Sequence, residues 1–319
     1  MTSTTAVAVF PGQGAQRVGM GQALADVSQA ARAVFEEVDT ALGESLSSLI
    51  FNGPQEELTL TANAQPALMA TSLAAVRAFE EAQNTALQNV VALAAGHSLG
   101  EYSALAAAGA LSITDAARLL RLRGEAMQAA VPIGEGAMAV ILGLDVDAVE
   151  AVAAAASEQC DGEVCELAND NAEGQAVLSG HRRAVEAAVP LAKEKGARRS
   201  MLLDVSAPFH CALMAPAAER LGEALANTRF ATPTRPVIAN VTAAAVSDAD
   251  QFPALLVEQV TARVRWRETM QTMGSMGCDR IVEFGAGRVL TGLARRALPQ
   301  ATLLNIGEPA DLDALQQNT

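Results

Sequence analysis

A short glycine-flanked segment, Gly96 to Gly100 with the sequence GHSLG, constrains the fold more than any other feature of the chain. It follows an apolar run from Val90 to Ala95 and precedes an alanine-rich stretch of helical character. A buried strand that turns sharply into a helix is the context of a G-x-S-x-G elbow, whose glycines permit the tight turn that presents the serine at the helix N-terminus. The pattern is weak evidence without that context. With it, we expect a parallel sheet whose strands alternate with helices.

The same alternation recurs along the rest of the chain. Ala6 to Phe10 is a short β-branched run that ends at Pro11-Gly12. Helical patterns cover residues 28–42, with a capping serine, and residues 63–83, with Asn63 as the cap and Pro66 in the first turn. Further strands are expected over residues 281–284 and 301–306. Together these segments predict a large α/β-hydrolase-like domain built on a parallel sheet.

Between Gly134 and Leu203 the pattern changes. It predicts a strand, a helix, two strands, a helix and a strand, over residues 137–142, 146–157, 163–168, 175–179, 182–195 and 198–203. That order is the split βαβ pattern of ferredoxin-like domains. We therefore expect a small ferredoxin-like domain, residues 134–203, inserted into a large catalytic α/β domain formed by residues 1–133 and 204–319.

Charge and composition narrow the possible partners. A net charge of −14 repels nucleic acid and anionic membranes. The N-terminus lacks the basic and apolar regions of a signal peptide, and no segment offers ~18 uncharged apolar residues to span a membrane. We expect a cytoplasmic protein with no nucleic-acid or membrane partner. Cys160, Cys165 and His181 fall one ligand short of a zinc site, so no metal is expected.

Ser98 needs a base, because a serine hydroxyl is a poor nucleophile until its proton is removed. The chain has three histidines. His97 adjoins Ser98 on a turn that sends neighbouring side chains apart, and His181 begins a helix of the small domain beside two arginines. His210 lies in a loop that Pro208 stiffens. An isolated loop histidine is as often purely structural, but elimination favours His210 as the base.

Arg123 is the most informative cation of the chain. On a helix expected over residues 114–130, an apolar stripe passes through Ala116, Leu120 and Met127, and Arg123 falls on that stripe. A buried arginine needs an anion, and its planar fork suits a carboxylate. From the residues alone two interpretations stay open: an internal ion pair with a glutamate, or a site for the carboxylate of a substrate.

Several motifs together resemble the malonyl-CoA:acyl carrier protein transacylases, which belong to the acyltransferases of fatty acid and polyketide synthesis. The motifs are PGQGAQ at Pro11 to Gln16, GHSLGEY at Gly96 to Tyr102 and APFHC at Ala207 to Cys211. The resemblance runs nearly end to end and includes Asn169 to Gly180 and Gly285 to Leu290. Within the last stretch the family more often has proline than Ala286, a departure that we expect to affect a loop and not the chemistry.

The resemblance assigns roles to six positions: catalytic Ser98 and His210, oxyanion-hole amides at Gln13 and Leu99, the carboxylate-binding Arg123, and the carbonyl of Gln259, which orients the histidine. In this family a backbone carbonyl accepts the ring N–H of the base, so no triad acid is needed. Phe209 is similar to the residue before the histidine in related polyketide acyltransferases that take malonyl.

The implied activity is that of an [acyl-carrier-protein] S-malonyltransferase. A malonyl group would pass from malonyl-CoA to Ser98, and then to the phosphopantetheine thiol of holo acyl carrier protein, supplying extender units for fatty acid biosynthesis. Malonyl-CoA is a substrate, so no bound cofactor is expected, and we expect a monomer. The sequence does not distinguish fatty acid synthesis from polyketide or malonate pathways, or malonyl from methylmalonyl. Candidates for docking an acidic carrier protein are Arg182-Arg183, Lys193, Lys195, Arg198-Arg199, Arg288 and Arg295-Arg296.

Three rival interpretations compete with this one. A serine hydrolase has the same elbow but lacks the PGQG turn and the βαββαβ insertion. An inactive module that binds carrier protein is disfavoured, because Ser98, His210 and Arg123 are all present. A nucleotide-binding loop at Gly12 and Gly14 is disfavoured, because neither the Rossmann glycine spacing nor Gly-Lys-Ser/Thr follows.

Overall fold

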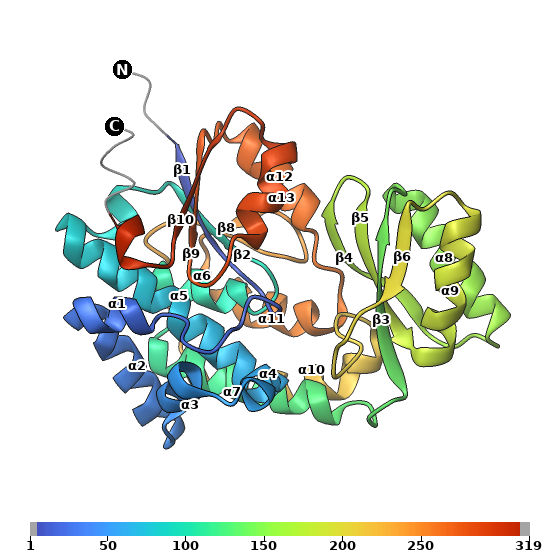
Figure 1. The fold of residues 1–319 in the computed structure, drawn as a ribbon, viewed down its shortest axis with the longest axis horizontal. Coiled ribbons are helices and arrows are strands. Elements are labelled where there is room, and N and C mark those ends of the chain that lie inside the picture. The colour runs from blue at the N-terminus through green and yellow to red at the C-terminus, as the bar shows by residue number, and fades with distance from the viewer. Residues whose placement is uncertain (1–4, 313–319) are drawn as a thin grey trace.

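The computed structural model describes residues 5–312 and shows a large lobe and a small lobe (Figure 1). The large lobe contains a six-stranded sheet and the small lobe a four-stranded sheet. A single continuous segment, from Gly136 at the start of β3 to Leu202 at the end of β6, supplies the small sheet. The expected boundaries at residues 134 and 203 lie just outside that segment. Whether the two lobes fold as separate domains stays a prediction.

The large sheet has the strand order β10-β9-β1-β2-β7-β8. Its strands are β1 (Ala6–Phe10), β2 (Leu93–Gly96), β7 (Val237–Ile238), β8 (Ala245–Val246), β9 (Arg280–Phe284) and β10 (Thr302–Ile306). All neighbours are parallel except β7 and β8. Phe10 pairs with Gly96 at the carboxyl ends of β1 and β2. The turns after these strands therefore emerge side by side, at the edge where open α/β sheets bind ligands.

Helices cover both faces of the large sheet. Alternate residues of a strand face opposite sides, and here both sets are apolar, so each face packs against its own helices. Ala8 and Phe10 of β1 pack into the core on one face, and Val7 and Val9 into a second core on the other. The first core takes in α2 (Gln29–Leu42), α5 (Thr61–Gln83), α6 (Gly100–Ala107), α7 (Ile113–Ala129), α10 (Ala215–Ala226) and α11 (Phe252–Thr261). The second takes in α12 (Trp266–Ser275) and α13 (Val289–Ala297). Short helices α1 (Gln22–Val27), α3 (Leu46–Asn52) and α4 (Gln55–Thr59) complete the lobe.

The small lobe is an antiparallel sheet with helices on one face. Its elements are β3 (Gly136–Leu142), α8 (Val146–Gln159), β4 (Cys165–Ala172), β5 (Gln175–His181), α9 (Arg182–Glu194) and β6 (Arg199–Leu202). The strand order β4-β5-β3-β6 is that of a ferredoxin-like sheet, and α8 and α9 share a separate core with it. The predicted α/β class, a parallel-sheet lobe with a small ferredoxin-like one, is confirmed.

Several elements differ from the expectation. Strand β2 begins at Leu93 and not at Val90. Helix α5 begins at Thr61 and not after Asn63, because the carbonyl of Leu60 already accepts from the amides of residues 63 and 64, so Asn63 is not its cap. Strand β4 continues to Ala172, because two register shifts after Leu167 let polar residues remain paired. The short pair β7 and β8 was not expected at all.

The lobes are joined beside the large sheet. Asn169 of β4 forms a parallel bridge with Val264, just before α12. Arg267 of α12 forms an ion pair at 2.8 Å with the buried carboxylate of Asp170. These contacts fix the polar part of β4 against the large lobe. Within the described residues, no helix combines the length and apolarity needed to cross a membrane.

Candidate active site

The elbow, residues 96–100, connects β2 to α6 and holds Ser98 in a left-handed conformation, with φ of 53°. Close backbone contacts explain its glycines. A Cβ on Gly96 would lie 1.8 Å from the carbonyl oxygen of Gly100, and a Cβ on Gly100 would lie 2.2 Å from that of Phe10. Only glycine fits at either position, so the elbow presents Ser98 in the sharp turn predicted from the sequence.

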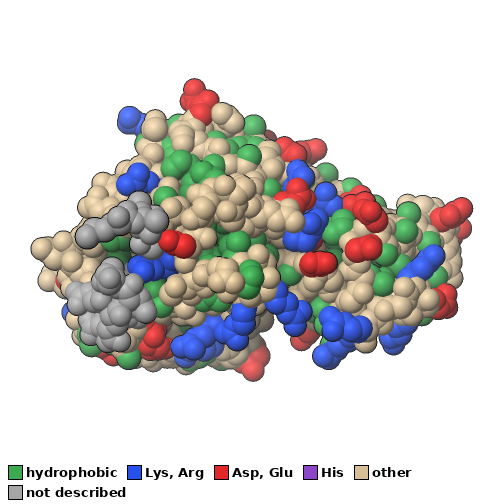
Figure 2. Space-filling view, turned by 90° about the horizontal axis from the view of Figure 1, so that it is seen from above, with side chains coloured by type: hydrophobic (Ala, Val, Ile, Leu, Met, Phe, Trp, Pro, Cys, Tyr) green, Lys and Arg blue, Asp and Glu red, His purple; other side chains and the backbone are tan. Residues whose placement is uncertain are grey.

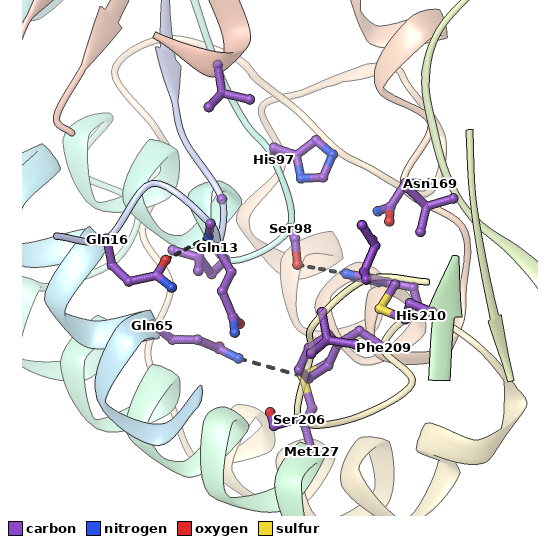
Figure 3. A pocket seen from close by; sticks show the side chains of 18 of the residues that line it. Gln13, Gln16, Gln65, His97, Ser98, Met127, Asn169, Ser206, Phe209 and His210 are labelled. Carbon is purple, nitrogen blue, oxygen red and sulfur yellow. Dashed lines mark hydrogen bonds between the residues drawn. The ribbon is translucent and has the colours of Figure 1, made fainter. Parts of the chain in front are cut away.

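His210 lies directly beside the serine. Its Nε2 is 2.7 Å from Ser98 Oγ (Figure 3). Its Nδ1 is 2.8 Å from the carbonyl oxygen of Gln259. The carbonyl accepts only, so Nδ1 carries the proton and Nε2 is free to take one from the serine. Burial lowers the pKa of His210 to about 3, and the positive charge of Arg123 acts in the same direction. The ring is therefore held neutral, as a base must be.

Arg123 projects from α7 toward the serine and is only 2% exposed, as the apolar stripe predicted. Its Nη2 lies 3.1 Å from Ser98 Oγ and 3.0 Å from Gln259 Oε1, and its Nη1 donates to Gln65 Oε1 at 2.8 Å. Its Nε is buried without a partner in the described chain. No carboxylate of residues 5–312 forms an ion pair with it, and burial lowers its pKa. The interpretation as a direct internal ion pair is wrong. Glu101 interacts with Arg123 through its charge but does not contact it as an ion pair, so the buried cation beside Ser98 has no direct anionic partner in the described chain.

Two backbone amides flank the serine. Gln13 lies in the turn after β1, and Leu99 follows Ser98 in the elbow. The two turns touch, because a Cβ on Gly12 would lie 2.8 Å from the carbonyl oxygen of His97. Within residues 5–312, neither the Gln13 nor the Leu99 amide donates a hydrogen bond to another protein group. Unused amides beside a nucleophile suit a developing oxyanion.

Several polar residues that sequence reasoning missed support this arrangement. Asn240 Oδ1 accepts from the Ser98 amide at 2.7 Å, while its Nδ2 donates to the Gly96 carbonyl at 2.7 Å. Glu101 accepts from the Gln259 side chain at 2.7 Å. Gln65 holds Arg123 from α5. Their signal in the sequence is weak, because a polar residue within an apolar segment indicates burial but not its partner.

A cavity of about 570 Å³ opens onto Ser98 and runs between the lobes (Figure 3). Its walls include Leu60, Met127, Val177, Phe209 and Val289. The small lobe contributes Asn169 and Asn171 of β4, and Asn171 Oδ1 lies 2.8 Å from the Nε2 of His97. His97 thus faces β4 and not the serine. The cavity has the size of a small-molecule site and gives the serine access to an acyl group on a long arm.

The described residues contain no group of three or more His, Cys, Asp and Glu side chains that could hold a metal ion. Cys160, Cys165 and Cys211 are buried, and burial raises the pKa of Cys165 to about 12 and of Cys211 to about 11. The thiols of Cys165 and Cys211 therefore remain protonated near neutral pH and pack as small apolar groups. Ser98 lines the cavity, and none of the four cysteines is among its lining residues.

Comparison with known proteins agrees with this geometry. The family model for the acyl transferase domain matches residues 7–307. The chain belongs to the acyl transferase domain family. The resemblance predicted from the sequence is therefore confirmed.

The chain is similar to several named proteins and solved structures. The malonyl CoA-acyl carrier protein transacylase of Bacillus subtilis (strain 168) is 45% identical over 305 residues, covering 96% of this chain and 94% of its own. The crystal structure of an acyl-carrier-protein-S-malonyltransferase from Bartonella henselae is 51% identical, with a TM-score of 0.95 and 99% of both chains covered. A malonyl-transacylase in complex with its type II PKS acyl-carrier protein is 40% identical, with a TM-score of 0.94, covering 99% of this chain and 100% of its own.

The acyl transferase domain thus brings all six predicted positions to one site. Ser98, His210, Arg123 and Gln259 are linked by hydrogen bonds, and the amides of Gln13 and Leu99 border the same cavity. The geometry can support attack by an activated serine on an acyl carbonyl, in a cavity that also offers an unpaired cation.

Proposed function

We propose that this chain transfers the malonyl group of malonyl-CoA to the phosphopantetheine thiol of holo acyl carrier protein, through an ester on Ser98. One observation carries the choice of malonyl: the guanidinium of Arg123 is buried 3.1 Å from Ser98 Oγ and has no carboxylate partner in the described chain. An acyl group with a free carboxylate at its far end would supply that partner. An acetyl group would leave the cation unpaired.

The first half-reaction forms the ester. Ser98 Oγ attacks the thioester carbonyl while its proton moves to His210 Nε2. The amides of Gln13 and Leu99 stabilise the tetrahedral oxyanion. The carbon–sulfur bond then breaks, and His210 returns the proton to the sulfur of coenzyme A. The carbonyl of Gln259 accepts from Nδ1 throughout and stabilises the imidazolium, so no triad acid is required.

The second half-reaction reverses the first. The phosphopantetheine thiol enters the cavity that coenzyme A has left and loses its proton to His210. Its sulfur attacks the ester, and Ser98 leaves with the proton from His210. Each thiol uses the same base and the same oxyanion amides, which is the pattern of ping-pong kinetics.

The substrate itself strengthens the base. The positive charge of Arg123 helps to lower the pKa of His210. A malonyl carboxylate at Arg123 offsets that charge, so the pKa of His210 rises when malonyl is bound and the imidazolium becomes easier to form. Malonyl is then favoured over acetyl in the rate of the chemical step as well as in affinity.

Shape and charge support the carrier protein as acceptor. Lys and Arg side chains line the lower edge of Figure 2, on the large lobe and across the notch on the small lobe. Such an edge suits an acidic carrier protein despite the net charge of −14. Among the candidate docking residues, Arg182 and Arg183 already form ion pairs with Glu186 and Asp161. Reversing the charge of the candidates should weaken carrier-protein affinity and leave malonyl-CoA affinity unchanged.

The remaining parts of the proposal concern context. We place the activity in the cytoplasm and in fatty acid synthesis, with no bound cofactor or metal, since the steps above need only side chains and backbone amides. One chain supplies every residue of the site, so a monomer suffices.

The test is the acyl preference of the Arg123→Ala variant. The natural chain should form its Ser98 ester faster from malonyl-CoA than from acetyl-CoA, and Arg123→Ala should remove about 3 kcal/mol of that preference, roughly a hundredfold. Arg118→Ala is the matched control, since Arg118 donates to the carbonyl of Ala41 away from the site. An unchanged preference in Arg123→Ala would contradict the malonyl assignment. Release of the acyl group to water alone would indicate a hydrolase.

A further inference from the structure

Glu101 is a buried carboxylate beneath the site that none of the steps above uses. It lies in the first turn of α6 and is 1% exposed. Its Oε2 accepts two hydrogen bonds, from the Gln259 side-chain Nε2 at 2.7 Å and from the Asn240 backbone amide at 3.0 Å. Asn240 and Gln259 both form hydrogen bonds with Ser98. Glu101 therefore links two residues that support the serine.

The first bond is the shorter of two that fix the orientation of the Gln259 amide, since its Nε2 donates to Glu101 Oε2 at 2.7 Å and to the Ser98 carbonyl oxygen at 3.1 Å. An ionised carboxylate only accepts hydrogen bonds, so the nitrogen of this amide must face Glu101. The amide oxygen, Oε1, then faces Arg123 and accepts from its Nη2 at 3.0 Å. Arg123 Nη2 also donates to Ser98 Oγ, at 3.1 Å. If the amide turned over, its nitrogen would confront the guanidinium and displace it.

The second bond anchors the residue that supports the elbow. The side chain of Asn240 spans the turn, accepting from the Ser98 amide and donating to the Gly96 carbonyl, each at 2.7 Å. Its own backbone amide is held by Glu101. Glu101 thus acts on the nucleophile through Asn240 and on the cation through Gln259.

We propose that Glu101 is a positioning residue for the transfer reaction, which together with the Ser98 carbonyl sets the orientation of the Gln259 amide and thereby holds Arg123 where it meets the malonyl carboxylate. This inference rests on the proposed function. Its consequence is specific: losing the acceptor at position 101 impairs the use of malonyl more than the use of acetyl, because acetyl makes no contact with Arg123.

The role requires an acceptor oxygen more than a charge. Both donors converge on one oxygen, Oε2, so an amide oxygen at the same place can accept both bonds. Burial raises the pKa of Glu101 to about 7, while the bonds from Asn240 and Gln259 and the charge of Arg123 lower it. A carboxyl group protonated on Oε1 still accepts on Oε2. The glutamine variant therefore imitates the natural residue, and the leucine variant does not.

The experiment compares kcat/KM for malonyl-CoA and acetyl-CoA in Glu101→Leu and Glu101→Gln. Glu101→Leu leaves the Asn240 amide without its acceptor and takes the shorter of two hydrogen bonds from Gln259 Nε2. Its malonyl-to-acetyl ratio should fall about tenfold or more, while Glu101→Gln should stay within about threefold of the natural ratio. A general loss of folded protein lowers kcat/KM equally for malonyl-CoA and acetyl-CoA, and so leaves their ratio unchanged. Thermal unfolding of each variant reports its folding separately.

A second variant tests the route. Gln259→Met removes the side-chain link between Glu101 and Arg123 but keeps the backbone carbonyl that orients His210. Its ratio should fall as in Glu101→Leu, and the double variant should fall no further, because both changes break the same link. If Glu101→Leu does not fold, Gln259→Met still tests the link.

Three outcomes would overturn the inference. They are an unchanged ratio in Glu101→Leu or Gln259→Met, an equal fall in Glu101→Gln and Glu101→Leu, and additive effects in the double variant. A natural chain without any preference for malonyl would instead refute the proposed function, and this result is distinguishable because it appears before any substitution is made.

Discussion

Arg123 and His210 meet at one atom, Ser98 Oγ, from which they lie 3.1 and 2.7 Å away. The arginine positions an anion, but its charge also disfavours protonation of the histidine. A site that binds a carboxylate beside a neutral base therefore needs the substrate to complete its electrostatics. The unpaired Nε of Arg123 and its lack of an ion-pair partner in the described chain fit such an incomplete state.

The pH dependence of acylation should report this coupling. In Arg123→Ala the neighbouring positive charge is gone, so the pKa of His210 rises from about 3 toward its ordinary value, although burial still holds it below 6.5. Protonated His210 cannot act as a base. The acidic limb of the rate of Ser98 modification by a serine-directed fluorophosphonate should thus move to higher pH in the variant. Identical pH profiles in Arg123→Ala and the natural chain would count against the coupling.

Single residues also show what the sequence could and could not reveal. Ser98 was predictable from its local context, His210 from the small number of histidines, and Arg123 from its place on an apolar stripe. Glu101 and Asn240 were not, because Asn240 contacts Ser98 from 142 residues away in the chain, and Glu101 contacts Asn240 from 139 residues away. Only the three-dimensional contact distinguishes a polar side chain that supports the site from one that merely lies inside.

At the scale of elements, the site depends on how closely the elbow approaches β1. Gly100, the first residue of α6, has no room for a Cβ, which would lie 2.2 Å from the Phe10 carbonyl oxygen and 3.0 Å from that of Pro11. Gln13 lies in the turn that follows Phe10 and Pro11. The distance between the two oxyanion amides is therefore set by the glycine at position 100.

Gly100→Ala should push α6 away from β1, lowering the free energy of unfolding by about 1–3 kcal/mol and slowing Ser98 acylation at least about tenfold. Gly292→Ala is the matched control, since a Cβ there meets nothing within 4 Å inside α13. It should raise the free energy of unfolding by about 0.5–1 kcal/mol and leave acylation unchanged. Urea unfolding and acylation rates measure both. A Gly100→Ala variant with natural stability and rate would disprove the steric argument.

The elements themselves were predicted where a strong pattern ran uninterrupted. Strand β1 matches the expected residues 6–10, and Ser28 caps α2 by accepting from the Ala31 amide. Strand β4 was predicted too short, because its last residues, Asn169 to Ala172, are polar or small and owe their pairing to β5 and Val264. Tertiary contacts, and not local propensity, extend this strand into the cavity.

At the scale of the whole molecule, the cavity lies between two lobes whose junction holds a buried charge. The carboxylate of Asp170 in β4 has a side-chain exposure of 1% and is paired with Arg267 of α12. The neighbouring strand residues Asn169 and Asn171 line the cavity. This ion pair thus fixes one wall of the site.

Arg267→Ala should leave Asp170 buried without its cation and lower the free energy of unfolding by about 3–5 kcal/mol. Arg263→Ala provides the control, because Arg263 also bridges the lobes, at 2.8 Å from Glu150, but that carboxylate is 53% exposed. Arg263→Ala should lower the free energy of unfolding by about 1 kcal/mol or less. Denaturant unfolding of the two variants checks the difference, and equal losses would refute the buried-charge explanation.

The measurement that tests the central claim most directly is the intact mass of the chain after brief mixing with malonyl-CoA, followed by addition of holo acyl carrier protein. We predict a malonyl-sized increase in mass that Ser98→Ala abolishes, and its transfer to the carrier protein when the latter is added. The absence of an adduct on the natural chain, or an adduct that only water removes, would contradict the account.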